Sequence, residues 1–191
     1  MKKNKLPMNL PNRLTMVRIA MIPVYLLLLT GGNWCRFAAG LVFAAASITD
    51  YFDGKIARER SLITDFGKFM DPIADKLLVL LPFMYFCATE PFGVADVWPV
   101  MLMVAREIIV SGFRLVASTK GKVIAADKFG KVKTATQMVT VITMTLRPII
   151  ESAIPWFGKI PWALLWACGV LSVYSGAEMI RKNLHILEVE E

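Results

Sequence analysis

The chain has 191 residues, of which 56% are hydrophobic and only 19% are charged, and its formal net charge is +7. A mean hydropathy of +0.55 excludes an ordinary soluble domain, a disordered chain and a fibrous protein. The basic balance favours contact with anionic lipid, and because no soluble basic motif is present we expect no nucleic-acid partner.

Apolar runs long enough to cross a bilayer follow one another along the chain. About 20 apolar residues span a bilayer, so we expect an all-α, polytopic membrane protein built as a six-helix bundle. The expected spans are residues 14–30, 35–57, 66–89, 95–117, 133–150 and 160–180. The whole chain, 1–191, then forms a single membrane domain, with an N-terminal interfacial segment at 1–13, the bundle at 14–182 and a tail at 183–191.

Lysine and arginine alternate between the two ends of this predicted bundle. Sixteen of them fall in residues 1–13, in the second and fourth connections and in the tail, whereas the other side holds only Arg36, Arg147 and Lys159. Because cytoplasmic loops retain lysine and arginine, both termini should be cytoplasmic. The five tryptophans fall at or near the opposite side, where indole rings favour the headgroup zone. We expect an integral protein of a bacterial cytoplasmic membrane.

Four aspartates interrupt the second and third apolar runs. On helices, Asp50 and Asp53 are three residues apart and Asp71 and Asp75 four apart, so each pair projects from one face. A short turn at residues 58–65 would bring the two faces together. A charge near the bilayer centre costs about 2.5–3.5 kcal/mol, so such acids are candidates for a functional site. One or two Mg²⁺ or Mn²⁺ ions would neutralise four carboxylates with the oxygen ligands that these ions prefer.

Two other interpretations of the four acids are open. In the first they are interfacial residues paired with neighbouring cations, namely Lys55, Arg58, Lys68 and Lys76. The rarity of acids within spans argues against this for all four. In the second they serve a proton relay or a cation transporter. The acids cluster at one end of their helices and do not line a path through the midplane, which argues against transport.

The residues between the acids favour a phosphorylated ligand. Gly54 and Ala57 leave an uncrowded helix face, and Arg58, one turn later, offers a fork of donors for phosphate oxygens. A metal-bridged diphosphate fits such a surface. Close helix packing, which is common in membranes, is the alternative explanation for Gly54 and Gly67.

Residues 50–75 resemble the complete signature of the CDP-alcohol phosphatidyltransferase family. The matching residues are Asp50, Asp53, Gly54, Ala57, Arg58, Gly67, Asp71 and Asp75. The resemblance implies a homodimeric helix bundle with a cytoplasm-facing polar cavity, in which a CDP-linked lipid donates its phosphatidyl group to an alcohol and CMP leaves. It also implies that the four aspartates ligate one or two metal ions, that Asp75 is the catalytic base, and that the other four residues border the CDP-lipid.

A second polar stretch bears on the acceptor alcohol. Cations facing one cavity suit a phosphorylated acceptor, and the candidates are Arg106, Arg114, Lys131 and Lys133. Positive-inside topology and snorkelling explain Lys120 and Lys122 but not Arg106, which lies with Glu107 inside a predicted span.

The same stretch resembles the branch of the family that uses glycerol 3-phosphate, as does "LPNRLTMVRI" with Asn12, Thr15 and Arg18. We therefore expect phosphatidyl transfer from CDP-diacylglycerol to glycerol 3-phosphate. Phosphatidylglycerol, inositol phosphate and serine are the alternative acceptors, and a cation transporter is the alternative from a different class.

Overall fold

The computed structural model describes residues 9–59, 64–89, 97–122, 124 and 128–186. Inside these ranges it describes only the backbone at residues 50–59, 65, 68 and 128. The regular elements of the described part of the chain are all helices, without a strand, which confirms the predicted all-α class. Its α-helices are α1 (Leu10–Leu29), α2 (Asn33–Glu59), α3 (Asp65–Thr89), α4 (Val97–Thr119), α5 (Lys128–Glu151) and α6 (Lys159–Asn183). Two short 3₁₀ helices, η2 (Pro155–Gly158) and η3 (Leu184–Ile186), flank α6.

Each predicted apolar run corresponds to one of these helices, and the largest differences are at two N-terminal ends. Helix α1 begins at Leu10, where the side chain of Asn9 accepts a hydrogen bond of 3.1 Å from the Asn12 amide and Pro11 occupies the first turn. Residues 10–13 are therefore helical and continuous with the rest of α1, whereas the predicted interfacial segment was to include them; residues 1–8 lie outside the described residues. Helix α5 starts at Lys128, five residues before the predicted span, because basic residues extend the helix beyond its apolar part.

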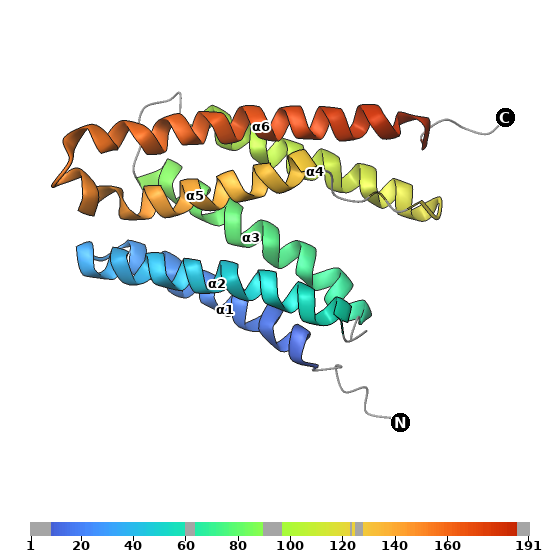
Figure 1. Ribbon diagram of the computed structural model, residues 1–191, viewed down its shortest axis with the longest axis horizontal. Coiled ribbons are helices and arrows are strands. Elements are labelled where there is room, and N and C mark those ends of the chain that lie inside the picture. Colours follow the sequence, from blue (N-terminus) through green and yellow to red (C-terminus); the bar gives the residue numbers. More distant parts are fainter. Residues whose placement is uncertain (1–8, 60–63, 90–96, 123, 125–127, 187–191) are drawn as a thin grey trace.

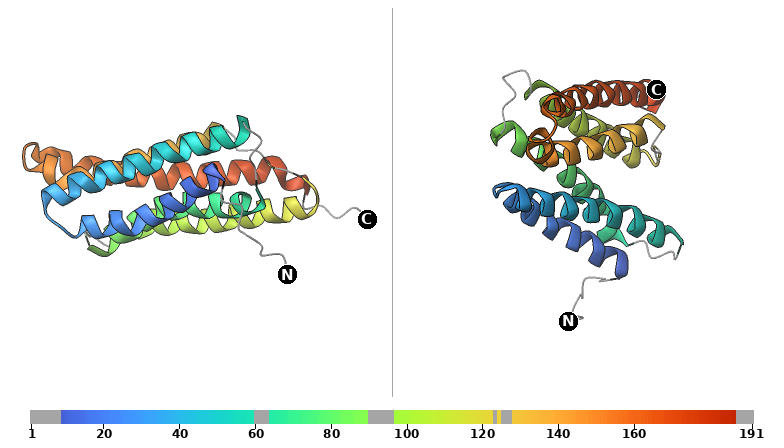
Figure 2. Two further views of the ribbon diagram at one scale, coloured as in Figure 1. Left: turned by 90° about the horizontal axis from the view of Figure 1, so that it is seen from below. Right: turned by 60° about the vertical axis from the view of Figure 1, so that its left-hand side comes forward.

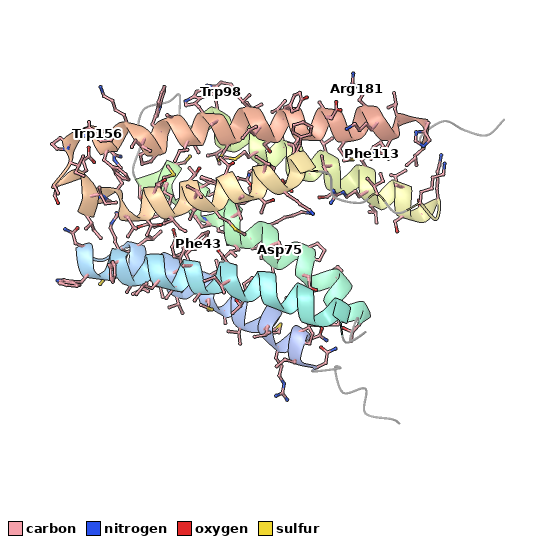
Figure 3. All side chains as sticks on the ribbon, viewed as in Figure 1. Phe43, Asp75, Trp98, Phe113, Trp156 and Arg181 are labelled. Atoms are coloured by element: carbon pink, nitrogen blue, oxygen red, sulfur yellow. The ribbon has the colours of Figure 1, made fainter. Side chains whose placement is uncertain are left out.

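The helices alternate in direction along the bundle (Figure 1). Helices α1 and α2 lie side by side on one flank, α4, α5 and α6 form the other, and α3 crosses obliquely between the two groups (Figures 1 and 2). The first residues of α1 and the last residues of α2, α4 and α6 share one end of the bundle. Trp156 lies at the opposite end and Arg181 toward this one (Figure 3), as the predicted orientation requires of tryptophan and arginine.

Three helical segments are long and apolar enough to cross a membrane, namely Leu10–Leu29, Phe69–Thr89 and Pro155–Ile186. In α4, three charged residues fall within the helix, namely Arg106, Glu107 and Arg114. Large apolar side chains are nevertheless exposed on this helix too, among them Ile108 and Leu115, each 68% exposed. Exposed apolar surface of this kind suits contact with lipid. Six crossings remain a prediction.

Aromatic side chains join three helices in the core. Tyr25 of α1 packs against Phe43 of α2 with ring centroids 5.5 Å apart, and both rings are almost fully buried. The Tyr25 hydroxyl lies 2.7 Å from the Thr145 hydroxyl of α5. A buried tyrosine normally satisfies its hydroxyl in this way, so the contact fixes α1 and α2 against α5.

Glycines allow α4 and α6 to approach closely. A Cβ atom at Gly169 would lie 2.9 Å from the Pro99 Cβ and 3.1 Å from its Cα. Neither atom can move without a shift of helix α4, because both belong to the rigid ring and backbone of a proline within it. Small residues at such positions are the usual means by which membrane helices pack together.

Gly169→Ala should therefore lower the free energy of unfolding by about 1–3 kcal/mol, the typical cost of overpacking. Gly112→Ala in α4 is the matched control, since a Cβ there meets no atom within 4 Å. It should raise stability by about 0.5–1 kcal/mol through helix propensity. Thermal unfolding in detergent measures both, and equal midpoints for the two variants would contradict the close α4–α6 contact.

Candidate functional site

Helix α1 holds two of the predicted metal ligands on α3. The Thr15 hydroxyl donates to Asp71 Oδ1 at 2.6 Å, and Arg18 Nη1 donates to Asp75 Oδ1 at 2.9 Å. The Arg18 side chain is fully buried, whereas the Asp75 side chain is 51% exposed. Spacings of three on α1 and four on α3 place each pair on one helix face. The two carboxylates are thus oriented by donors that reach them from inside the bundle, and Asp75 extends toward the space between the two helix groups (Figure 3).

The N-terminal end of α3 is fixed to α1 by a second set of contacts. Thr64 caps α3 by accepting a hydrogen bond of 3.0 Å from the Gly67 amide, and its hydroxyl donates to Asn12 Oδ1 at 3.0 Å. A Cβ at Gly67 would lie 3.0 Å from the same Asn12 oxygen and 3.6 Å from Asp71 Oδ2. Gly67 therefore allows α3 to pack closely on α1, which is the alternative explanation that the sequence allowed. Its contact with the CDP-lipid stays a prediction.

A cavity of about 670 Å³ opens between α3, α4 and α5. Asp71 and Asp75 line its α3 wall, together with Lys76. Its α4 and α5 walls carry three cations, Arg106, Arg114 and Lys133, and one acid, Glu107. The charges are thus sorted, with the aspartates on one side and the cations mainly on the other. The volume falls within the 300–1,000 Å³ typical of a pocket for a small ligand.

Glu107 stands at the centre of the cationic wall. Its Oε1 accepts a hydrogen bond of 2.8 Å from Arg106 Nη1, and the same oxygen forms an ion pair with Lys133 Nζ of α5. The Glu107 and Lys133 side chains are only 12% and 8% exposed. Breaking a buried ion pair by removing one partner leaves a buried charge and is strongly destabilising. Glu107 therefore joins α4 to α5 at the cavity.

Arg106 is also bound to α6. Its Nη2 donates to Ser175 Oγ at 2.8 Å and its Nε to the Ser172 carbonyl at 3.2 Å. Gly176 provides the space, because a Cβ there would lie 2.8 Å from Arg106 Cγ. Among the described residues, three of the five N–H groups of this guanidinium therefore have a partner.

Lys76 closes the α3–α4 side of the cavity. Its Nζ donates to Ser111 Oγ at 2.5 Å, and Ser111 donates in turn to the Glu107 carbonyl of its own helix. The lysine that follows Asp75 in the sequence therefore crosses to the helix that carries the cations.

Five of the predicted site residues meet at this cavity, and they are Asp71, Asp75, Arg106, Arg114 and Lys133. Lys131 is exposed and does not line it, so its part in phosphate binding stays a prediction. Five more belong to the backbone of α2, with side chains outside the described residues, and they are Asp50, Asp53, Gly54, Ala57 and Arg58.

Whether the described residues can hold a divalent metal ion depends on the oxygen ligands that they offer. Among the described residues no three acidic, histidine or cysteine side chains group closely enough to hold an ion. Asp71 and Asp75 nevertheless supply two carboxylates four residues apart, whose Oδ1 atoms are held by Thr15 and Arg18 of α1. Such a pair suits part of an Mg²⁺ or Mn²⁺ site, which would need further ligands such as the α2 acids.

Sequence reasoning assigned no role to several residues that shape this site. Asn12, Thr15 and Arg18 supported only the resemblance to one branch of the family and had no predicted role. Glu107, Lys76 and Ser175 were not predicted as site residues. Arg18 and Glu107 had a usable signal, because each is a charge within an apolar run and therefore needs a partner. Ser175 had none, since a serine within a membrane helix is common.

A family model named CDP-alcohol phosphatidyltransferase matches residues 8–174. The chain therefore belongs to the CDP-alcohol phosphatidyltransferase family, whose signature residues lie on α2 and α3. It is 35% identical to the CDP-diacylglycerol–glycerol-3-phosphate 3-phosphatidyltransferase of Bacillus subtilis (strain 168), over 94% of this chain and 97% of that protein. It is 38% identical to the proteins of the same name from Shigella flexneri serotype 5b and Escherichia coli (strain K12), over 87% of this chain and 90% of each. The protein is thus an enzyme of the phosphatidyltransferase type.

Thr15→Val tests whether α1 orients the α3 acids. The variant keeps the side-chain shape but loses the hydrogen bond to Asp71, and a bond to a charged group contributes about 1.5–3 kcal/mol. We expect CMP release per folded protein to fall roughly tenfold or more. Thermal unfolding in detergent measures separately how far the lost bond lowers stability. Thr136→Val is the control, because the Thr136 hydroxyl donates to the Val132 carbonyl of its own helix. Equal activities for the two variants would show that the Thr15–Asp71 contact has no catalytic importance.

Proposed function

We propose that the protein transfers the phosphatidyl group of CDP-diacylglycerol to glycerol 3-phosphate, giving phosphatidylglycerophosphate and CMP in phospholipid biosynthesis. The observation that carries the proposal is the cavity with carboxylates on one wall and cations on the other, in a chain that matches relatives of this name over most of its length. A diphosphate donor bound through divalent ions suits the first wall, and an acceptor that carries a phosphate suits the second.

The donor would bind at the α2–α3 side. Asp71 and Asp75, with Asp50 and Asp53 of α2, would hold one or two Mg²⁺ or Mn²⁺ ions, and these would offset negative charge on the diphosphate and on the departing CMP. Gly54, Ala57, Arg58 and Gly67 would border the CDP-lipid.

Asp75 is the proposed general base. Its side chain is half-exposed and lines the cavity, while Arg18 holds one of its oxygens from the buried side. A carboxylate in this position can take the proton from the attacking hydroxyl once the acceptor lies in the cavity. Arg18 would keep the carboxylate oriented throughout the reaction.

The acceptor phosphate would bind to Arg106, Arg114 and Lys133. A dianionic phosphate and several cations match in charge, whereas a zwitterionic acceptor such as serine would need fewer cations. Charge-assisted hydrogen bonds of this kind are about twice as strong as neutral ones.

The position of the site in a membrane follows from the alternating directions of the helices. We propose six crossings with both termini in the cytoplasm, and a homodimeric assembly as the family resemblance implies. The cavity would then lie toward the cytoplasmic end of α3, so that glycerol 3-phosphate and CMP exchange with water while the acyl chains of the donor remain in lipid.

Asp71→Asn tests the metal site. The amide is a weaker ligand than the carboxylate, and we expect CMP release and Mn²⁺ binding to fall at least about a hundredfold, since even outer-shell changes cost 10–100-fold. Mn²⁺ binding is followed by electron paramagnetic resonance. Glu178→Gln is the control, because this acid pairs with Arg181 and Lys182 of its own helix and lies outside the cavity. Full activity in the presence of EDTA would refute metal dependence.

An acceptor panel tests the function itself. Purified protein with CDP-diacylglycerol and Mg²⁺ or Mn²⁺ should release CMP with glycerol 3-phosphate and much less with glycerol, serine, inositol phosphate or phosphatidylglycerol. If serine or phosphatidylglycerol is preferred, the acceptor proposal is wrong and the transferase proposal survives. A protein that releases no CMP with any acceptor would favour the transporter alternative.

The acceptor phosphate site is tested by Arg114→Gln. The loss of one charge-assisted hydrogen bond should raise the apparent KM for glycerol 3-phosphate about tenfold or more and leave that for CDP-diacylglycerol nearly unchanged. Lys131→Gln is the matched comparison on the neighbouring helix, and its effect should be small because Lys131 does not line the cavity. A larger effect of Lys131→Gln would relocate the phosphate to the exposed side of α5.

A further inference from the structure

We propose that Glu107 determines acceptor specificity by accepting a hydrogen bond from a second hydroxyl group of the acceptor. This inference rests on the proposed function and deepens it. The cavity would then recognise three features of one small molecule: an attacking hydroxyl, a phosphate and a further hydroxyl between them. Glycerol 3-phosphate has all three.

The contacts of Glu107 leave one carboxylate oxygen for a ligand. Among the described residues, both partners of this side chain, Arg106 and Lys133, contact Oε1. Oε2 of Glu107 is not among the buried side-chain atoms that lack a partner, so this oxygen is accessible. Because Glu107 lines the cavity, Oε2 is open to it. A carboxylate oxygen can only accept hydrogen bonds. The natural partner for Oε2 is therefore an uncharged donor such as a hydroxyl group.

The surrounding charges decide which part of the acceptor lies here. The carboxylate repels a phosphate, which is drawn instead to Arg114 and Lys133. The attacking hydroxyl must approach Asp75 on the α3 wall. Glu107 lines the same cavity from α4, and it contacts Lys133 directly. A hydroxyl between the attacking oxygen and the phosphate is the part of the acceptor that remains to be bound.

Pairing Arg106 and Lys133 occupies only one of the two oxygens of Glu107, because both cations contact Oε1. An acid in an apolar helix is costly unless its hydrogen-bonding capacity is used, so a role for Oε2 is expected as well. A site that binds a hydroxyl group discriminates strongly against an analogue that lacks it, because a polar group of the protein is then left without a partner. Glu107 would exclude phosphorylated acceptors without a second hydroxyl.

The test compares glycerol 3-phosphate with 3-hydroxypropyl phosphate, which lacks only the central hydroxyl. In the wild-type protein we expect kcat/KM to be about ten- to a hundredfold higher for glycerol 3-phosphate, the range for one hydrogen bond to a charged group. In Glu107→Gln, Arg106 and Lys133 can still donate to the amide oxygen of the glutamine. The amide NH₂ group, which is a donor, then takes the place of Oε2, which is an acceptor. The preference should then fall about five- to tenfold, because the charge-assisted bond is lost.

Two control variants separate specificity from structure. Arg114→Gln loses a phosphate contact that both acceptors make, and among the described residues Arg114 has no hydrogen bond or ion pair with Glu107, so it should lower both values of kcat/KM and leave their ratio unchanged. Glu151→Gln removes an acid that pairs with Arg147 on the same helix outside the cavity, and both the activity and the ratio should stay at the wild-type values. If Glu107→Gln does not fold, the double variant Glu107→Gln with Lys133→Met removes both charges of this ion pair, so that neither is left buried without its partner. Its ratio of the two kcat/KM values should still lie below that of the wild-type protein.

The outcomes distinguish this inference from the proposed function. Equal losses for both acceptors in Glu107→Gln would show that Glu107 only pairs the cations, and the specificity role would be wrong while the function stands. An unchanged ratio in the double variant would overturn it in the same way. A wild-type protein that releases no CMP with either acceptor would overturn the proposed function, and the inference with it.

Discussion

A charged side chain inside an apolar helix bundle needs a partner, and this constraint organises the protein. Arg18 of α1 binds Asp75 of α3, Lys76 of α3 binds Ser111 of α4, Glu107 of α4 binds Lys133 of α5, and Arg106 of α4 binds α6 through Ser175. These contacts form a continuous path through five helices, and every step lies at or beside the cavity. The charges that make the site chemically useful are therefore the same charges that fix the helices around it, because an unpaired buried charge would cost several kcal/mol.

Different helices supply the carboxylates and the cations of the site. Helix α3 presents carboxylates that α1 orients from behind, through the buried Thr15 and Arg18. Helices α4 and α5 present cations, and their positions depend on Glu107 and on α6. Each functional group thus has a support that lies away from the ligand. Precise placement of this kind is what positioning of two substrates requires, since reaction rates fall steeply when reacting atoms are misplaced by about 1 Å.

Buried polar groups continue from the cavity into the core along α5. Gln137 donates to the Met103 sulfur at 3.2 Å, and the Thr140 hydroxyl lies 3.1 Å from the Cys168 sulfur of α6. Beyond them Thr145 contacts the Tyr25 hydroxyl. Polar side chains in a membrane bundle form hydrogen bonds between helices, and in model systems each contributes about 0.6–2 kcal/mol. This row gives α5 a fixed rotation, so that Lys133 at its cavity end faces Glu107.

The helices and the chemical class followed from the sequence alone, because apolar runs, basic connections and the spacing of Asp71 and Asp75 are properties of consecutive residues. The eight-residue signature likewise depends only on local order, and the family was correctly predicted from it. The contacts between residues far apart in the sequence, such as the partner of Asp75, could not be predicted from local patterns. That Arg18 binds Asp75 across 57 positions, that Glu107 joins Arg106 to Lys133, and that Lys131 lies outside the cavity while Lys133 lines it depend on helix rotation and packing. Rotation is set by contacts between distant segments, such as Gly169 against Pro99 and Tyr25 against Thr145, and no local pattern encodes which two faces will meet.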